Sequence, residues 1–191
     1  MKRILVFSVL LLLCTSLCFA DDQFWTFDTD ISGWNSPVST WASTITWNGT
    51  EGHTAAGSIE CTDSDVWAGA RNTVTIGAGD PGYLLTAWVK IMSADATHGL
   101  ALNTWNLDRD NSGGTTDPFD VGTIGTWQSK SHSGNAGSSL VTGYIMINTA
   151  APWGSTDPAT YLWYIDDVSY DETPILSVED WSLYSSKAVL Q

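Results

Sequence analysis

The sequence predicts an all-β protein built as a two-sheet β-sandwich. Between residues 22 and 171, apolar and polar residues alternate with a period of two, which is the pattern of strands that bury one face. Clusters of Gly, Asn, Asp, Ser and Pro interrupt the alternation at intervals of roughly 8–12 residues, a spacing typical of a sandwich or barrel of short strands. No amphipathic helical stretch stands out, so we expect strands alone to form the core.

Nine segments are expected to form strands. Each places β-branched, aromatic or aliphatic residues at alternate positions and is bounded by turn-forming residues. In chain order they are residues 24–28, 41–47, 58–62, 72–76, 83–92, 98–105, 123–130, 141–148 and 161–170. Pro174 follows the last of them, so the folded domain is expected over residues 22–172 and a C-terminal tail over residues 173–191.

The first 20 residues have the pattern of a secretory signal peptide. Residues 2 and 3 are basic, residues 4–13 form an apolar run that only Ser8 interrupts, and small residues lead to Ala20. This pattern favours export with cleavage before Asp21. The alternative is a transmembrane anchor, although the apolar run is short for a bilayer span.

Composition excludes two classes of protein. The chain has 7 Lys+Arg against 21 Asp+Glu, a charge of −14, and it becomes −16 once Lys2 and Arg3 leave with the signal peptide. A nucleic-acid binder needs basic residues to neutralise phosphates, so that class is excluded. Aromatic residues make up 12% of the chain, with 11 Trp, which argues against intrinsic disorder.

Cysteine use is consistent with an exported domain that has no internal disulfide. Of the 3 Cys, two precede the expected cleavage point and only Cys61 remains. Such a domain depends on core packing or on a metal. Cys61 itself is expected to be a small buried hydrophobe in a strand.

Alternation sorts the residues of three strands between two faces. In residues 83–92 the set from Tyr83 to Ile91 is apolar and belongs to the core, which leaves Trp88 and Lys90 on the other face. Residues 98–105 place Asn103 and Trp105 opposite the apolar set. Residues 141–148 place Tyr144, Met146 and Asn148 there.

Aromatic and polar groups therefore share the non-core faces of these strands. If the strands belong to one sheet, that face suits sugar binding, because pyranose C–H faces stack on aromatic rings while hydroxyls need amide or ammonium partners. The alternative for any one Trp is packing under a loop.

Five stretches, in order, resemble the carbohydrate-binding modules of families 4, 9 and 22. Phe24-Trp-Thr-Phe-Asp28 with Gly33-Trp34 is similar to their opening, and residues 53–59 to their second signature. Residues 82–90 resemble the central strand, residues 122–127 the Trp strand, and Tyr164-Ile-Asp-Asp-Val168 the closing motif. The resemblance implies a galactose-binding-like jelly roll that binds polysaccharide or oligosaccharide without catalysis.

The resemblance also implies a structural calcium that joins the first strand to the last. By position, Asp28 and Asp166 would be its ligands. Asp28 is one methylene shorter than the Glu of the family motif, and Asp30 could substitute for it.

A second argument for the ion comes from the alternation itself. It places Asp166 on the face of Leu162, Tyr164 and Val168, and a carboxylate on an apolar face must be paired or coordinate a cation. Two Asp plus carbonyls of the loop near residues 53–57 could supply calcium with oxygens. The alternative is a carboxylate that caps loop amides.

The predicted binding residues fall into two groups. Trp67, in a Trp-x-Gly sequence, resembles the position from which family 22 members present a stacking Trp. Trp105 and Tyr144 would add aromatic rings, followed by Trp88. Asn103, Lys90 and Asn148 would contact sugar hydroxyls, and Trp34, Trp127 and Trp163 are assigned to the core or its rim.

Three functions remain open. The leading expectation is a secreted, noncatalytic carbohydrate-binding module, and the runner-up is a structural or adhesive module that contacts proteins. A small glycan-degrading enzyme is the third, since a facing pair of carboxylates among the acidic residues is possible. Asp166 and Asp167 are not expected to be that pair, because adjacent strand residues point to opposite faces.

The tail has a resemblance of its own. Residues 175–184 resemble the start of the C-terminal sorting domains of type IX-secreted Bacteroidetes proteins, without the stretch that normally follows. A truncated sorting segment is the interpretation.

Overall fold

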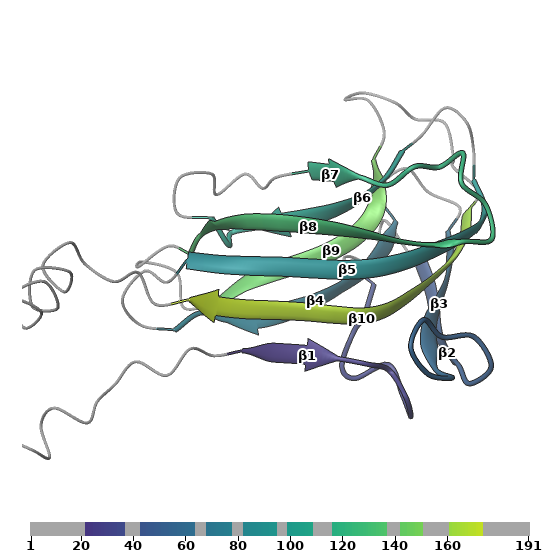
Figure 1. The fold of residues 1–191 in the computed structure, drawn as a ribbon, viewed down its shortest axis with the longest axis horizontal. Coiled ribbons are helices and arrows are strands. Elements are labelled where there is room, and N and C mark those ends of the chain that lie inside the picture. The colour runs from purple at the N-terminus through teal and green to yellow at the C-terminus, as the bar shows by residue number, and fades with distance from the viewer. Residues whose placement is uncertain are drawn as a thin grey trace, which may run out of the picture.

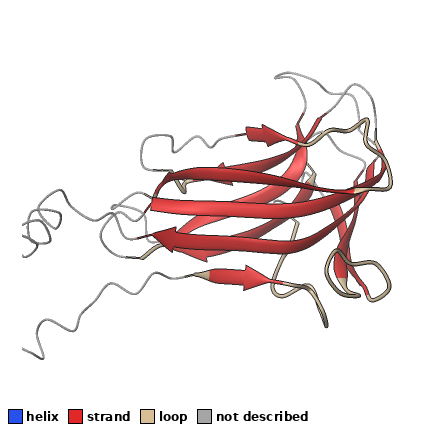
Figure 2. Cartoon of the chain, viewed as in Figure 1, coloured by secondary structure: helices blue, strands red, loops and turns tan. Residues whose placement is uncertain are grey.

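The protein is a two-layer arrangement of β-strands (Figures 1 and 2). A computed structural model describes residues 22–36, 43–63, 68–77, 82–94, 99–108, 116–136, 142–150 and 161–173. Ten strands form within them and no helix does. They are β1 (Gln23–Trp25), β2 (Ser43–Asn48), β3 (Ser58–Asp63), β4 (Gly69–Thr75), β5 (Gly82–Ser93), β6 (Gly99–Trp105), β7 (Thr116–Pro118), β8 (Trp127–Asn135), β9 (Thr142–Ala150) and β10 (Tyr161–Thr173).

The first sheet has six strands, and all pairs within it are antiparallel. Its order is β2-β3-β10-β5-β8, with β1 added beside β10. The long strand β10 pairs with β5 along one side. Along its other side it pairs first with β3, through residues 161–165, and then with β1, through residues 168–170.

The second sheet has four antiparallel strands in the order β4-β9-β6-β7. It forms a second layer, and in Figure 1 its strands β4, β9 and β6 lie behind the long strands of the first sheet. At one open side, β7 of the second sheet comes near β8 of the first. There His132 of β8 lies between two carboxylates, 2.9 Å from Asp117 and 3.4 Å from Asp108.

The core lies between the two sheets and is almost entirely apolar. The inward set of β5 is buried along its whole length, as alternation predicts, from Tyr83 to Ile91. The second sheet contributes Leu100, Leu102 and Ile145 among others, each at most 1% exposed. Burial of this apolar area is the main stabilising contribution to a fold of this kind.

The predicted all-β sandwich is confirmed, and each of the nine expected strands has a counterpart. β7 was not expected: it is three residues long and ends in Pro118, so it has no alternation to detect. Cys61 is a small buried residue of β3, as predicted. The expected signal peptide, residues 1–20, lies outside the described residues, as does the tail from residue 174 onward.

The expectation that Asp166 shares one face of β10 with Leu162, Tyr164 and Val168 is wrong. Asp167 has a positive φ of 45°, and the pairing with β5 shifts register between Asp166 and Ser169. This bulge interrupts the alternation, so Val168 points into the core while Asp166 lies with Leu162 and Tyr164 on the opposite face. The carboxylate of Asp166 therefore does not point into the apolar core.

Within the described ranges, no helix is long and apolar enough to cross a membrane.

Candidate functional site: a polar-aromatic face

The outer face of the second sheet gathers aromatic and polar side chains from three neighbouring strands. Directly paired residues lie on the same face of a sheet, so the register defines the rows. Thr73, Tyr144 and Trp105 form one row across β4, β9 and β6. Arg71, Met146 and Asn103 form the next, and the third contains Asn148. We call these seven residues the polar-aromatic face.

Two of the predicted stacking residues are neighbours on this face. Trp105 pairs directly with Tyr144, which places their Cβ atoms about 5 Å apart by ordinary sheet geometry. Trp105 is 48% exposed, although a buried position would be more usual for so large an aromatic side chain. The sequence-based prediction that these two residues share a surface is confirmed by the register.

The two predicted asparagines lie at the floor of the face. Asn103 is 8% and Asn148 5% exposed, and Asn103 Nδ2 donates to Asn148 Oδ1. Asn148 Nδ2 in turn donates to the carbonyl of Thr149. This network fixes both amide groups and orients Oδ1 of Asn103, for which the described residues provide no donor.

Arg71 is the charged residue of this face, and sequence reasoning missed it. Its Cζ lies 5.0 Å from the centroid of the Tyr144 ring, within the range of a cation–π contact. The predicted strand began at Asn72, whereas β4 begins at Gly69. Its signal in the sequence was the alternation along β4. Ala70 and Val74 are buried in the core, whereas Gly69, Arg71 and Thr73 lie at the intervening positions.

Trp67, the first-ranked stacking residue, lies outside the described residues. The neighbouring Gly69 is buried against β9, and a Cβ there would approach the Ile147 carbonyl to 2.2 Å. The requirement for Gly in the Trp-x-Gly sequence therefore has a packing reason.

Trp88 and Lys90 do not belong to the polar-aromatic face, which corrects the prediction. They lie on β5, in the first sheet. The Trp88 ring stacks on His53 at 3.8 Å with an angle of 17°, and Lys90 Nζ pairs with Glu51 at 2.7 Å. Alternation assigned both side chains correctly to a non-core face but could not say to which sheet that face belonged.

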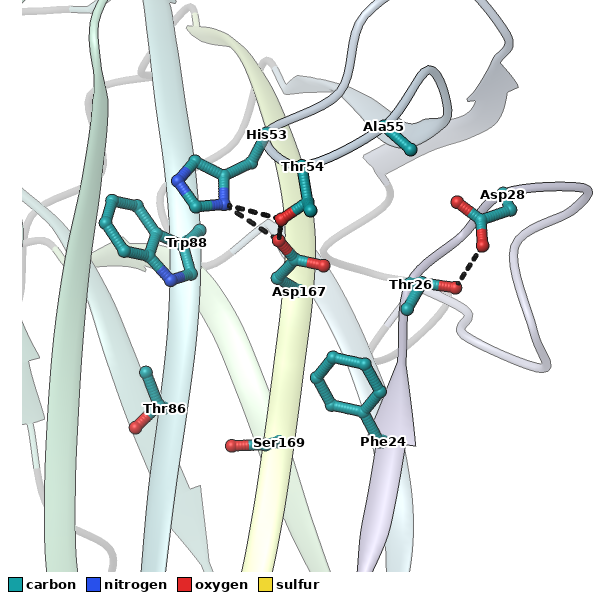
Figure 3. Close-up of a pocket in the computed structure, with 10 residues that line it drawn as sticks. All are labelled: Phe24, Thr26, Asp28, His53, Thr54, Ala55, Thr86, Trp88, Asp167 and Ser169. Carbon is teal, nitrogen blue, oxygen red and sulfur yellow. Dashed lines mark hydrogen bonds and ion pairs between the residues drawn. The ribbon is translucent and has the colours of Figure 1, made fainter.

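The outer face of the first sheet carries an open cavity beside Trp88 (Figure 3). Its volume is about 430 Å³, and its walls come from β1, β5, β10 and the turn between β2 and β3. The lining residues are Phe24, Thr26, Asp28, His53, Thr54, Ala55, Thr86, Trp88, Asp167 and Ser169.

Hydrogen bonds fix the turn above this cavity. Asp167 accepts from Thr54 Oγ1, and its Oδ2 lies 2.8 Å from His53 Nδ1. Asp166 Oδ2 accepts from the amide N–H of His53 at 2.7 Å. Both carboxylates therefore reach the same turn, which simple alternation forbids and the bulge at Asp167 permits.

Asp166 is the better fitted of the two predicted calcium ligands. It is 1% exposed, and desolvation by burial raises its pKa to about 6, against the lowering effect of its bonds from the amides of His53 and Asp167. Those two bonds correspond to the alternative in which the carboxylate caps loop amides. The two amides are neutral donors, so the negative charge of the buried carboxylate remains, and a cation would stabilise it.

Asp28 fits less closely. Its Oδ2 accepts from Thr26 Oγ1 at 2.8 Å and the residue is exposed. The turn that holds His53 does approach it, since a Cβ on Gly57 would lie 2.8 Å from the Asp28 Cα. No three His, Cys, Asp or Glu side chains converge among the described residues, so carbonyl oxygens would have to complete a calcium shell. The oxygen-only chemistry of the two Asp residues fits calcium.

Comparison with known proteins supports the fold independently of sequence. No protein-family model matches the chain, and no curated protein matches it. Among solved structures, it is similar to the family 22 module and xylanase module of Clostridium thermocellum endo-1,4-β-D-xylanase 10B with xylohexaose. The TM-score is 0.62 at 18% identity, over 84% of this chain and 30% of that one.

Two further structures match over nearly their whole length. A xylan-binding domain of family 22 gives a TM-score of 0.57 at 15% identity, and the match covers 81% of this chain and 96% of that one. A family 61 module in complex with β-1,4-galactotriose gives 0.51 at 14%, covering 78% and 94%. At such identities the likeness concerns the fold, and the chain has the β-sandwich fold of carbohydrate-binding modules of the family 22 type.

Proposed function

We propose that this protein is a noncatalytic carbohydrate-binding module that binds a polysaccharide or oligosaccharide on the polar-aromatic face. One observation carries the proposal: the register places Trp105 and Tyr144 side by side on an outer sheet face. Polar side chains of Arg71, Asn103 and Asn148 occupy the adjoining rows.

This arrangement matches the two requirements of a sugar ring. Aromatic side chains offer apolar area at low entropic cost for the C–H face of a pyranose. Amide and guanidinium groups beside them supply the directional hydrogen bonds that hydroxyls require. The fixed asparagine pair reduces the rotamer entropy lost on binding.

The glycans associated with the similar structures suggest which ligands to try first. Two of these structures concern xylan or xylohexaose and one β-1,4-galactotriose. We therefore expect a β-linked polysaccharide to be bound, and calorimetry against xylan, β-1,4-galactan, β-glucan, laminarin, cellulose and mannan tests this.

The variant that tests the face is Trp105→Ala. Loss of a stacking Trp from the binding surface should lower affinity at least roughly tenfold, while the melting temperature stays nearly unchanged because the side chain is half exposed. The matched control is Phe24→Ala, which removes an aromatic ring that is 63% exposed on the first sheet. A folded protein that binds none of these glycans would instead favour the protein-contact module.

The absence of catalysis is part of the same proposal. A reducing-sugar release assay on the glycan that binds most tightly should give no product. Release that survives repurification would replace the binding module with the small glycan-degrading enzyme.

We also propose that Asp28 and Asp166 hold a structural calcium between the first and last strands, and that the protein acts outside the cell after removal of residues 1–20. The buried charge of Asp166 supports the first statement and the basic-apolar leader sequence supports the second. Calcium that binds only the folded state stabilises it by mass action.

Chelation tests the calcium. EDTA should lower the melting temperature of the wild type and added CaCl₂ should restore it. The Asp166→Asn variant should show no difference between the two conditions. Equal melting temperatures of the wild type with EDTA and with calcium would contradict the proposal.

A further inference from the structure

Arg71 gives the polar-aromatic face a positive charge on its edge strand, β4. It lies on β4 in the same row as Met146 and Asn103, and its guanidinium lies over the ring of Tyr144 at 5.0 Å. Any glycan that contacts Tyr144 thus comes within reach of this cation.

The position of Arg71 is fixed by neutral groups. Its Nε donates to Asn35 Oδ1 at 3.3 Å. The backbones of Asn35 and Arg71 exchange two hydrogen bonds, of 3.0 and 2.8 Å. These contacts orient the guanidinium without using the donors on its two Nη atoms.

Within the described part of the chain, no carboxylate forms an ion pair with Arg71. This is unexpected in a protein with 21 acidic and only 7 basic residues. Lys90, by contrast, is paired with Glu51. A cation that is held in place on a binding face, with neutral neighbours, is suited to an anionic partner that arrives with the ligand.

We infer that Arg71 selects glycans that carry a carboxylate, that is, a uronic acid residue, on the part of the sugar chain that lies over Tyr144. The inference rests on the proposed function. A guanidinium binds a carboxylate through two parallel N–H···O bonds in a planar fork. Nε of Arg71 is already bonded to Asn35. The fork must therefore use the two Nη groups, with each carboxylate oxygen accepting from one of them.

The net charge of the protein limits which acidic glycans fit. The chain has a charge of −14. It therefore repels polyanions over a distance of about one Debye length, roughly 10 Å at moderate salt. A polyuronate places a charge on every residue and meets this repulsion along its whole length. The ligand class is therefore a largely neutral polysaccharide with isolated uronic acid substituents.

A glycan array with matched ligands tests the inference. It holds xylan, β-1,4-galactan and mannan oligosaccharides in neutral form, with one uronic acid side group, and with that side group reduced to the alcohol, together with polygalacturonate. Calorimetry then measures the tightest acid and reduced pair. The wild type should bind the acid roughly tenfold or more tightly than its reduced counterpart, as a charge-assisted pair of hydrogen bonds predicts.

Variants assign that preference to Arg71. Arg71→Gln should bring the acid-to-reduced ratio close to one while affinity for the reduced ligand changes little, and Arg71→Lys should give an intermediate ratio because it keeps the charge without the fork. Lys90→Gln, which removes a cation from the other sheet, should leave the ratio at the wild-type value.

The outcomes are distinguishable. Equal wild-type affinity for acid and reduced ligands overturns the inference, yet that binding would still support the proposed function. Tightest binding to polygalacturonate overturns the isolated-substituent class. No binding to any ligand on the array overturns the proposed function and the inference with it. The wild-type ratio decides the matter even if Arg71→Gln fails to fold.

Discussion

At the scale of the residue, the tryptophans divide by environment. Trp34 is 1% exposed and meets Trp25 and Phe27 edge-to-face, each at 5.8 Å, while Trp163 is fully buried beside Tyr161. Trp47 donates its indole N–H to the Phe27 carbonyl. Much of the Trp excess therefore stabilises the domain, and Trp105 stands apart among the described residues as the exposed Trp on the polar-aromatic face.

Tyr83 predicts an alkaline limit to stability. Burial, and then its hydrogen bond to Asp108 at 2.7 Å, raise the pKa of Tyr83 well above its ordinary value of 10.0. Because the folded state holds the proton more tightly than the unfolded state, this group stabilises the fold below pH 10 and loses that contribution as pH rises further. The free energy of unfolding should fall above about pH 10, and less steeply in Tyr83→Phe.

Denaturant melts at several pH values, together with phenolate absorbance, measure this. Ionisation of Tyr83 in the folded protein near pH 10, without loss of structure, would contradict the prediction.

Gly57 predicts a steric cost. Its φ is +138°, and a Cβ would lie 2.5 Å from the Phe27 carbonyl oxygen. Gly57→Ala should destabilise the protein by about 3 kcal/mol, since both backbone strain and a clash with main chain arise. Gly125 has a φ of +72° with nothing within 4 Å, so Gly125→Ala should cost only about 1 kcal/mol.

Urea unfolding of the two variants gives the comparison. Equal losses would show that the turn carrying Gly57 can move away from Phe27 and Asp28 without cost.

At the scale of the element, the turn between β2 and β3 depends on Trp88. His53 stacks on the Trp88 ring and is hydrogen-bonded to Asp167, so this turn lies against the first sheet, on the opposite side of the molecule's core from the polar-aromatic face. The residues first predicted to bind sugar from β5 are thus part of a structural contact.

Trp88→Ala should therefore lower stability by about 2 kcal/mol, from lost ring packing, and leave glycan affinity within about twofold. Leu84→Ala is the control, because Leu84 lies on the same face of β5 and is 45% exposed. Its loss should change stability by no more than about 0.5 kcal/mol. A Trp88→Ala protein that stays stable but loses glycan binding would restore the original prediction.

The strand patterns were enough to predict the fold, but they did not say which of the predicted site residues lie on the same sheet. Alternation placed Trp105, Tyr144 and Trp88 on outer faces correctly, because a side chain's face depends only on its own strand. The choice of sheet depends on pairing between distant segments, and for Trp88 it could not be read locally. The bulge at Asp167 was equally hidden, since a positive φ at an Asp leaves no mark on the pattern of neighbouring residues.

At the scale of the whole molecule, net charge opposes compactness. Like charges repel in the folded state, and salt screens this repulsion. The melting temperature should rise with NaCl concentration in chelator-treated protein, and affinity for a neutral glycan should stay nearly constant. Differential scanning fluorimetry and calorimetry at low and high salt test both statements. A falling melting temperature would show that ion pairs such as Lys90–Glu51 outweigh the general repulsion.

The pairing of β1 with β10 has a mechanical consequence. Gln23 lies opposite Tyr170 and Trp25 opposite Val168 in an antiparallel register, so the beginning of β1 and the end of β10 leave the sandwich on the same side, as Figure 1 shows. Tension applied through the flanking segments would open this pair one hydrogen bond at a time, like a zipper, instead of shearing all of them together. A module tethered at both ends would thus yield at low force, beginning with β1, and pulling experiments on single molecules can measure that threshold.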